Sequence, residues 1–322
     1  MRPMAKTPAG FRAALFAGWI VLGAAGIAYA RVKNIPNWAA LPVLAAFLIT
    51  YPFYLVPGFP QLRAQLKGWK LHAYALAGAL LPYLACTFGA VEFHWSAVAR
   101  LAALTLAMTF WFHVLPRMPL FDLAFLGLVP LVLLGKYFDP IYVSRYEGWR
   151  DLIVLGHLAL IQTAAVALLE ARRVNDPGYG FIPQAKDWRS GALHFAIFLA
   201  LAIPLALLLH IGQLREVAVW KAAGSFFGFL WVVALSEEFL VQGVLLDWVA
   251  QWSGSRPAAL LVSSAVFGSL HLWFGTFPNW RMVALTALLG WFCGRARFHS
   301  GSIRAAMVTH ALAATARLFV MR

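Results

Sequence analysis

The chain has few charged residues for its length. Only 12% of its 322 residues are charged, while 62% are hydrophobic. A soluble domain has about a quarter of its residues charged and about half apolar. The shortage of charge leaves almost nothing for a separate soluble domain. The apolar residues gather in long runs separated by charged loops, which is the pattern of a protein that crosses a membrane several times.

Acidic residues are especially scarce, with 12 Asp and Glu against 26 Lys and Arg, for a formal net charge of +14. In a soluble protein such an excess would suggest nucleic acid. Here the basic residues lie mainly between the apolar runs, where they set orientation and contact anionic lipid head groups. We therefore expect membrane lipid as a partner and no nucleic acid.

Cysteine is almost absent as well. The two cysteines, Cys86 and Cys293, both lie within apolar runs and belong to no Cys-x-x-Cys or Cys/His pair. This excludes a disulfide framework or a zinc knuckle. The sequence also lacks Gly-x-Ser-x-Gly and His-Glu-x-x-His, so it carries neither a serine hydrolase elbow nor a zincin helix.

The apolar runs predict an all-α fold, a polytopic transmembrane helix bundle of about 8–11 spans of about 17–25 residues each. The candidate spans are 11–30, 38–56, 71–90, 98–115, 120–138, 151–169, 192–211, 222–250, 258–274, 282–298 and 304–320. The longest polar connection runs over 170–190. We therefore expect N-terminal helices of unknown role in 1–190, and a transmembrane domain with the active-site core in 191–322.

Ionisable residues inside the later spans are the main functional signal. Glu237 and Glu238 lie within the apolar run 226–249, and His271 and His310 lie in later runs. An ionisable side chain near the middle of a span costs roughly 2.5–3.5 kcal/mol, so it usually faces a partner or a wet cavity and marks function. Three separate spans could bring these four groups together in the core of a helix bundle.

Helical spacing suggests supporting residues for this site. Adjacent helical residues point about 100° apart, so Glu237 and Glu238 cannot face the same point. Gln242 follows Glu238 by four residues, which places it on the same face, where it can hold that carboxylate by a hydrogen bond. Phe267 precedes His271 by four residues and shares its face in the same way.

These residue types limit the available chemistry. A glutamate can activate water while histidines polarise a carbonyl group or stabilise an oxyanion. The residues alone leave other interpretations open. They could form a buried polar cluster that fixes helix packing, a proton or ion path, or a site in which Glu237, His271 and His310 hold a divalent metal such as zinc.

Three ordered motifs in residues 220–322 resemble those of a known family. The motifs are Glu237-Glu238-Phe239-Leu240-Val241-Gln242, then Phe267-Gly268-Ser269-Leu270-His271, then Gly301-Ser302-Ile303 leading to His310-Ala311. In this order they resemble the CAAX protease and bacteriocin-processing family (CPBP or Abi). These intramembrane proteases include the CAAX prenyl endopeptidases.

The resemblance implies an all-helical membrane endopeptidase that hydrolyses a peptide bond in a membrane-associated protein or peptide. It implies that Glu237 activates water with support from Glu238, that His271 positions the water, and that His310 helps to bind the oxyanion. The lack of a zincin motif favours a glutamate-type enzyme without a cofactor, with a divalent metal such as zinc as the alternative. The expected location is a bacterial inner (plasma) membrane, as a multi-pass integral protein.

The chain departs from the family pattern at two positions. Gln242 replaces the arginine that usually ends the first motif, and Ala314 replaces the asparagine of the usual His-x-x-x-Asn. Asn279, Thr309 and Thr315 are candidates to supply the missing hydrogen-bond donor. The alternative functions are a non-catalytic family member that acts as a membrane binding or immunity-type protein and, less favoured, a transporter.

Overall fold

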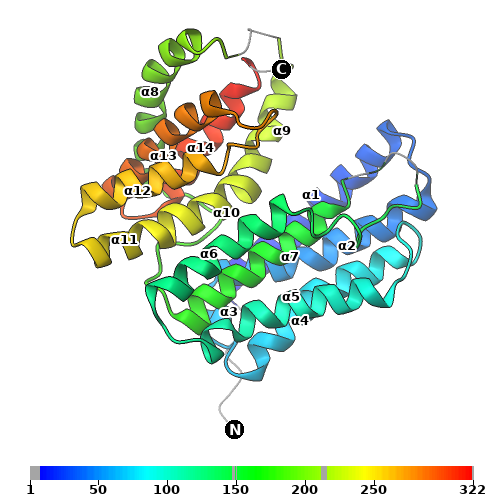
Figure 1. The fold of residues 1–322 in the computed structure, drawn as a ribbon. Coiled ribbons are helices and arrows are strands. Elements are labelled where there is room, and N and C mark those ends of the chain that lie inside the picture. Colours follow the sequence, from blue (N-terminus) through cyan, green and yellow to red (C-terminus); the bar gives the residue numbers. More distant parts are fainter. Residues whose placement is uncertain (1–7, 147–148, 150, 212–215, 321–322) are drawn as a thin grey trace. The chain divides into compact units, whose positions relative to one another are not determined.

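The computed structural model describes residues 8–146, 149, 151–211 and 216–320. Within these ranges the chain is built of helices, with one isolated β-bridge between Val91 and Ser144. The predicted all-α fold is confirmed (Figure 1). The chain forms two compact units, Met1–Val174 and Asn175–Arg322.

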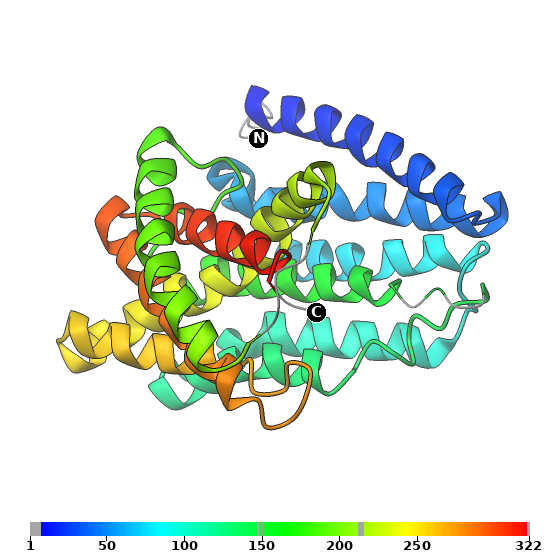
Figure 2. The same cartoon turned by 90° about the horizontal axis from the view of Figure 1, so that it is seen from above.

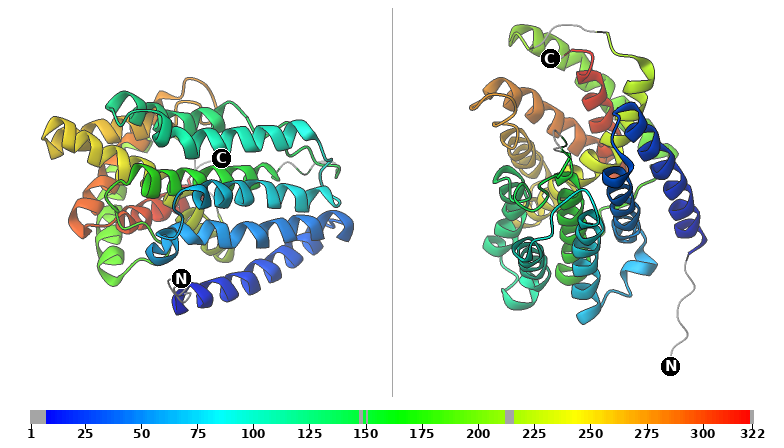
Figure 3. Two further views of the ribbon diagram at one scale, coloured as in Figure 1. Left: turned by 90° about the horizontal axis from the view of Figure 1, so that it is seen from below. Right: turned by 90° about the vertical axis from the view of Figure 1, so that its right-hand side faces the viewer.

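The first unit is a bundle of long apolar helices. Its α-helices are α1 (Ala9–Val32), α2 (Asn37–Leu55), α3 (Pro60–Arg63), α4 (Trp69–Thr87), α5 (Trp95–Val114), α6 (Pro119–Leu134) and α7 (Ile153–Val166). A π-helical turn, Ala167–Arg172, continues α7. Helix α1 packs along α2, and α4 packs between α2 and α5 (Figure 3).

Small residues allow α2 and α4 to pack closely. Ala39 and Ala46 on α2 and Ala75 on α4 are fully buried. In a membrane, helices gain little from the hydrophobic effect between them, so small side chains that let backbones approach are the usual basis of packing. These alanines therefore account for the neighbouring positions of two helices whose sequences show no polar face.

The second unit contains the helices that carry the predicted site. They are α8 (Ala185–Leu208), α9 (Val219–Gly228), α10 (Leu235–Glu238), α11 (Leu246–Ser253), α12 (Arg256–Ser269), α13 (Trp280–Ser300) and α14 (Ile303–Arg317). Helices α8, α13 and α14 pack against one another, and α12 packs on α13 (Figure 2).

Helices α9 to α11 form one continuous helical stretch, Val219–Ser253, of 35 residues. It is π-helical at Phe229–Ala234 and again at Phe239–Leu245. The four residues of α10, Leu235–Glu238, lie between these two segments. π-Helical turns are rare and often occur at functional sites. The backbone geometry on both sides of Glu237 and Glu238 is therefore consistent with a functional role for these residues.

Six helical stretches among the described residues are long and apolar enough to cross a membrane. They are Ala9–Val32, Asn37–Gly58, Trp95–Val114, Ile153–Arg172, Ala185–Leu208 and Val219–Ser253. The remaining predicted spans also fall on helices, but α6, α12 and α14 have 16, 14 and 15 residues. The chain is a multi-pass membrane protein by this measure.

The boundary between the two units falls within the connection 170–190, at Val174 and Asn175. It precedes the expected boundary at 190 because residues 175–184 pack onto the second unit. For example, the Ile303 N–H at the start of α14 donates to the Pro177 carbonyl at 2.9 Å. The connecting segment therefore belongs with the helices of the predicted site.

Candidate functional site

The third motif forms the turn that begins α14. Gly301 ends α13 in the left-handed conformation, with φ of 76°, which costs glycine less than any other residue. Ser302 then caps α14, and its hydroxyl accepts from the Arg304 N–H at 3.2 Å. Gly301 and Ser302 thus fix where α14 starts, and so fix the direction in which His310 points two turns later.

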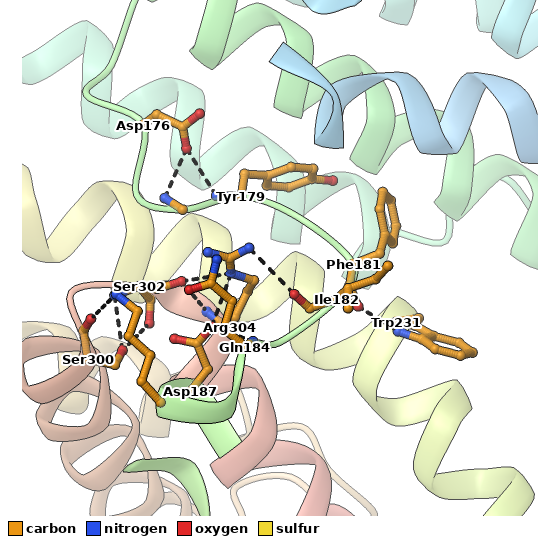
Figure 4. A network of polar contacts seen from close by, with 12 residues as sticks. Asp176, Tyr179, Phe181, Ile182, Gln184, Asp187, Trp231, Ser300, Ser302 and Arg304 are labelled. Atoms are coloured by element: carbon orange, nitrogen blue, oxygen red, sulfur yellow. Dashed lines mark hydrogen bonds and ion pairs between the residues drawn. The ribbon is translucent and has the colours of Figure 1, made fainter. Parts of the chain in front are cut away.

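A polar network ties the connecting segment to this turn (Figure 4). Asp187 is fully buried, and its carboxylate accepts from the Gln184 N–H at 2.8 Å and lies 3.4 Å from Arg304 Nε. Lys186 donates to the Ser300 carbonyl at 3.0 Å. These contacts hold the start of α8 against the start of α14.

The same segment also reaches the helix that carries the glutamates. Trp231 Nε1 donates to the Phe181 carbonyl at 2.9 Å (Figure 4). The ring of Tyr179 meets that of Phe239 edge-on, with centroids 4.8 Å apart. Phe239 directly follows Glu238, so the connecting segment contacts the glutamate helix on both sides of α10. It therefore supports the backbone on which Glu237 and Glu238 sit.

Glu238 and His310 form a buried pair at the centre of this unit. His310 Nδ1 lies 2.8 Å from Glu238 Oε1, although the two residues are 72 positions apart in sequence. Glu238 is fully buried, and His310 is 5% exposed. With Nδ1 occupied, Nε2 is the atom of His310 that can face a substrate, and it can donate a hydrogen bond when the ring is protonated.

Both glutamates keep oxygen atoms without a hydrogen-bond donor. Glu238 Oε2 and Glu237 Oε2 are buried and have no hydrogen-bond partner among the described residues. Cys293 adjoins Glu238, but its thiol is directed to the Ala306 carbonyl at 3.7 Å. Glu237 is only partly buried, and its charge acts on His310. Such unsatisfied carboxylate oxygens are costly in a core and call for an explanation.

Phe267 connects the two histidines. Its fully buried ring lies 5.3 Å from the His271 ring and 5.5 Å, edge-on, from the His310 ring. His271 lies in the turn that follows α12, whereas the sequence had placed it inside the predicted span 258–274. Its Nδ1 lies 3.0 Å from the Phe267 carbonyl. Because a carbonyl only accepts, Nδ1 carries the proton, and Nε2 of the neutral ring keeps a free lone pair.

The structure brings together some of the predicted residues but not all of them. Glu238 meets His310 directly, and Phe267 contacts both histidines. No hydrogen bond joins His271 to Glu237 or to Glu238 within the described ranges; its imidazole bonds to the Phe267 carbonyl near the end of α12. The site therefore consists of the Glu238–His310 pair, with Glu237 and His271 as two further groups that are not hydrogen-bonded to it.

Gln242 does not hold Glu238, and that expectation is corrected. Its amide donates to the Gly290 carbonyl at 3.1 Å, and its oxygen faces the Ser263 hydroxyl at 3.5 Å. The prediction assumed 3.6 residues per turn, but the segment that begins at Phe239 is π-helical. The fully buried Gln242 thus joins the glutamate helix to α12 and α13.

The three alternative donors have other roles. Asn279 caps α13, accepting from the Met282 N–H at 3.1 Å while its own amide donates to the Phe274 carbonyl. Thr309 and Thr315 donate to backbone carbonyls at 3.1 Å and 2.7 Å. All three therefore make local backbone contacts, and none of them bonds to Glu238 or His310 among the described residues.

The positions of Glu237, His271 and His310 decide whether they could share a metal ion. Within the described ranges, no three His, Cys, Asp or Glu side chains are placed to hold one ion. Glu237, His271 and His310 therefore do not fit the metal trio considered from the sequence.

Arg317 lies beside the site and was not predicted from the sequence. Its guanidinium lies over the Phe274 ring, 4.4 Å from the centroid, and its charge interacts with those of Glu237 and His310. Its position seven residues after His310, on the same face of α14, was the available signal.

The fold and these contacts define a class: an all-helical membrane protein with a carboxylate–imidazole pair buried in its C-terminal helices. Residues 218–316 match a family model described as type II CAAX prenyl endopeptidase Rce1-like. The resemblance seen in the three motifs is thereby confirmed over this segment. Neither the curated proteins nor the solved structures gave a significant match. The match supports a CAAX-type intramembrane protease at the level of the family.

Proposed function

We propose that the second unit is an endopeptidase that hydrolyses a peptide bond in a membrane-associated substrate with water activated by Glu237. The observation that carries the proposal is the buried Glu238–His310 pair at 2.8 Å, next to a glutamate whose buried oxygen has no partner. It lies within the segment that matches the family.

In the proposed reaction, Glu237 removes a proton from water as the water oxygen attacks the scissile carbonyl carbon. His271 has a free Nε2 lone pair and orients the same water. His310, held by Glu238, donates from Nε2 to the carbonyl oxygen as negative charge develops there. The proton on Glu237 then passes to the leaving amine, and the carbon–nitrogen bond breaks. The products are a carboxylate and an amine, so the atoms balance.

The family description and the membrane helices support a substrate that is held at the membrane. We infer a peptide held at the bilayer by its own lipid group, with a prenylated C-terminal CAAX peptide as the first choice. The assay should therefore compare a farnesylated CAAX peptide with the same peptide lacking the lipid, both presented in liposomes.

The test is Glu237→Gln in the full chain, reconstituted in liposomes and assayed by mass spectrometry of the released fragment. General-base removal should lower kcat by about 10²–10⁴, while thermal unfolding in detergent stays the same. Glu92→Gln is the matched control, because the Glu92 side chain is 60% exposed. If the wild-type protein cleaves the peptide and Glu237→Gln cleaves it equally fast, Glu237 is not the base.

A second candidate is a non-catalytic relative that binds a membrane partner. Ala314 at the usual asparagine position favours it, and so does the structural use of Gln242. That function predicts that Glu237→Gln leaves partner binding unchanged and that the wild-type protein releases no fragment from either peptide.

A further inference from the structure

Oxyanion sites gain from each donor aimed at the developing charge, and the neutral side chains near this site already donate elsewhere. The side chains of Gln242, Asn279, Thr309 and Thr315 all donate to backbone carbonyls. Redirecting any of them would break the contact that the side chain makes in the structure, at a cost of about 0.5–1.5 kcal/mol for a typical hydrogen bond. A donor whose side chain is not already bonded to the backbone is therefore the better candidate, and Arg317 meets that condition among the described residues.

Arg317 has the position that this role requires. His310, Ala314 and Arg317 follow one another at four and three residues on α14, and such positions share one face of a helix. Ala314 has only a methyl group there, so the longer Arg317 side chain can lie back along that face towards His310. Side chains on a helix point towards its N-terminus, which is the direction of His310.

The contacts of Arg317 agree with this position. Its guanidinium lies 4.4 Å from the centre of the Phe274 ring, and that ring is 6.5 Å from the His271 ring. Its charge interacts with those of Glu237 and His310, yet no ion pair joins it to either residue within the described ranges. Stacking on Phe274 leaves the N–H groups at the guanidinium edge available to an acceptor.

We propose that Arg317 is a catalytic residue that donates to the carbonyl oxygen of the scissile peptide bond, alongside His310. This inference rests on the proposed peptidase function. The guanidinium takes the place of the amide missing at Ala314, and it brings a full positive charge to an oxygen that becomes negative. Glu237 and Arg317 then act on opposite ends of the same reaction, one on the water and the other on the carbonyl oxygen.

The test compares Arg317→Met, Arg317→Lys and the double variant Ala314→Asn/Arg317→Met in the liposome assay. Loss of one oxyanion donor should lower kcat by about 10²–10³ with KM changed less than about threefold. Arg317→Lys should retain part of the rate because it keeps the charge. The double variant should regain at least about tenfold over Arg317→Met, because the introduced amide supplies a donor one turn from His310. Arg295→Met, at an exposed arginine of α13, is the matched control.

A second measurement does not depend on turnover. A peptide phosphinate imitates the tetrahedral intermediate, and an N-methylated peptide of the same sequence imitates the substrate. Arg317→Met should weaken phosphinate binding at least about tenfold more than binding of the N-methylated peptide. Equal weakening of both, or a rise in KM alone, would overturn the inference and would indicate that Arg317 binds a substrate carboxylate.

These outcomes separate the inference from the proposed function. If Glu237→Gln abolishes cleavage but Arg317→Met retains full kcat, the peptidase stands and the role of Arg317 falls. If the wild-type protein cleaves nothing and binds the phosphinate no better than the N-methylated peptide, both fall. If Arg317→Met does not fold in detergent, Arg317→Lys takes its place. It should also lower kcat and weaken phosphinate binding more than binding of the N-methylated peptide.

Discussion

The two units treat their buried carboxylates differently. In the first unit, Asp122 is 1% exposed and receives two hydrogen bonds of 2.7 Å from the fork of Arg172. In the second unit, Glu238 is fully buried, and one of its oxygens lies 2.8 Å from His310 Nδ1, while the other has no hydrogen-bond partner among the described residues. The Asp122 carboxylate is thus neutralised by Arg172, while Glu238 has an oxygen that can still accept a hydrogen bond.

This difference distinguishes a carboxylate that stabilises the fold from one that is available for the proposed reaction. A buried arginine–carboxylate fork satisfies both partners and has a fixed geometry. An imidazole can gain or lose a proton, so it neutralises a carboxylate less completely and leaves room for proton movement. The first unit pairs Glu170 with Arg63 at 2.8 Å in the same structural way. We therefore expect substitutions in the first unit to act on stability and those at Glu238 to act on turnover.

The largest effect on stability is expected from Asp122→Ala. It removes the carboxylate that accepts both bonds of the Arg172 fork, and breaking a buried pair from one side costs about 3–5 kcal/mol. Unfolding in detergent–SDS mixtures should show that loss, while kcat of the folded fraction stays unchanged. Asp151→Ala, at an exposed position, should change neither quantity. A drop in kcat without a loss of stability would contradict the structural role of this pair.

Glu238→Gln should show the opposite behaviour. Glutamine keeps an acceptor for His310 but removes the carboxylate charge, so the imidazole should be held less firmly and kcat should fall by about tenfold to a hundredfold. Because a buried charge disappears, the unfolding free energy should stay the same or rise. Steady-state kinetics and SDS unfolding of one preparation check both, with Glu216→Gln as an exposed control. Strong destabilisation would make Glu238 a structural residue like Asp122.

Gln242→Ala tests whether every buried polar residue of the second unit is functional. It removes the donor to the Gly290 carbonyl, so the unfolding free energy should fall by about 1–3 kcal/mol. Turnover of the folded protein should change by less than about threefold, since the Gln242 amide bonds to the Gly290 carbonyl and to Ser263 rather than to Glu238. Gln251→Ala, on the exposed face of α11, is the control. A large loss of kcat would restore the role expected from the sequence.

Ser302→Ala should have the smallest effect. It removes the cap of α14, which is worth about 1 kcal/mol. Fraying at this end also loosens the start of the helix that carries His310, so a slight fall in kcat should accompany the lower melting temperature. Ser269→Ala is the comparison, because the hydroxyl of that exposed residue bonds only within its own helical turn. Equal melting temperatures for the two variants would argue against the capping role.

The sequence predicted the features that follow from composition and order along the chain. Long apolar runs predicted the all-α membrane fold, and the cost of ionisable groups in those runs singled out Glu238 and His310. The sequence could not predict that the helix is π-helical after Glu238, because its side-chain pattern differs little from that of an α-helix. For that reason the predicted hydrogen bond from Gln242 to Glu238 was wrong, and Gln242 bonds to the Gly290 carbonyl instead.

Other features depended on contacts between distant segments. The sequence did not show that α12 ends before His271, or that Tyr179 and Trp231 link the connecting segment to the glutamate helix. Arg317 does not stand out in the sequence because a basic residue near the end of an apolar run is the normal pattern for a membrane helix. Only its stacking on Phe274 separates it from an interface anchor.

The separation of 72 residues between Glu238 and His310 has a consequence for biosynthesis. At ribosomal rates of about 5–20 residues per second, the histidine emerges roughly 4–14 s after the glutamate. During that interval the nascent chain already contains its proposed base but lacks the imidazole that completes the site. On the proposed mechanism, cleavage can begin only after α14 has packed beside the glutamate helix, so a partly synthesised chain would lack a complete site.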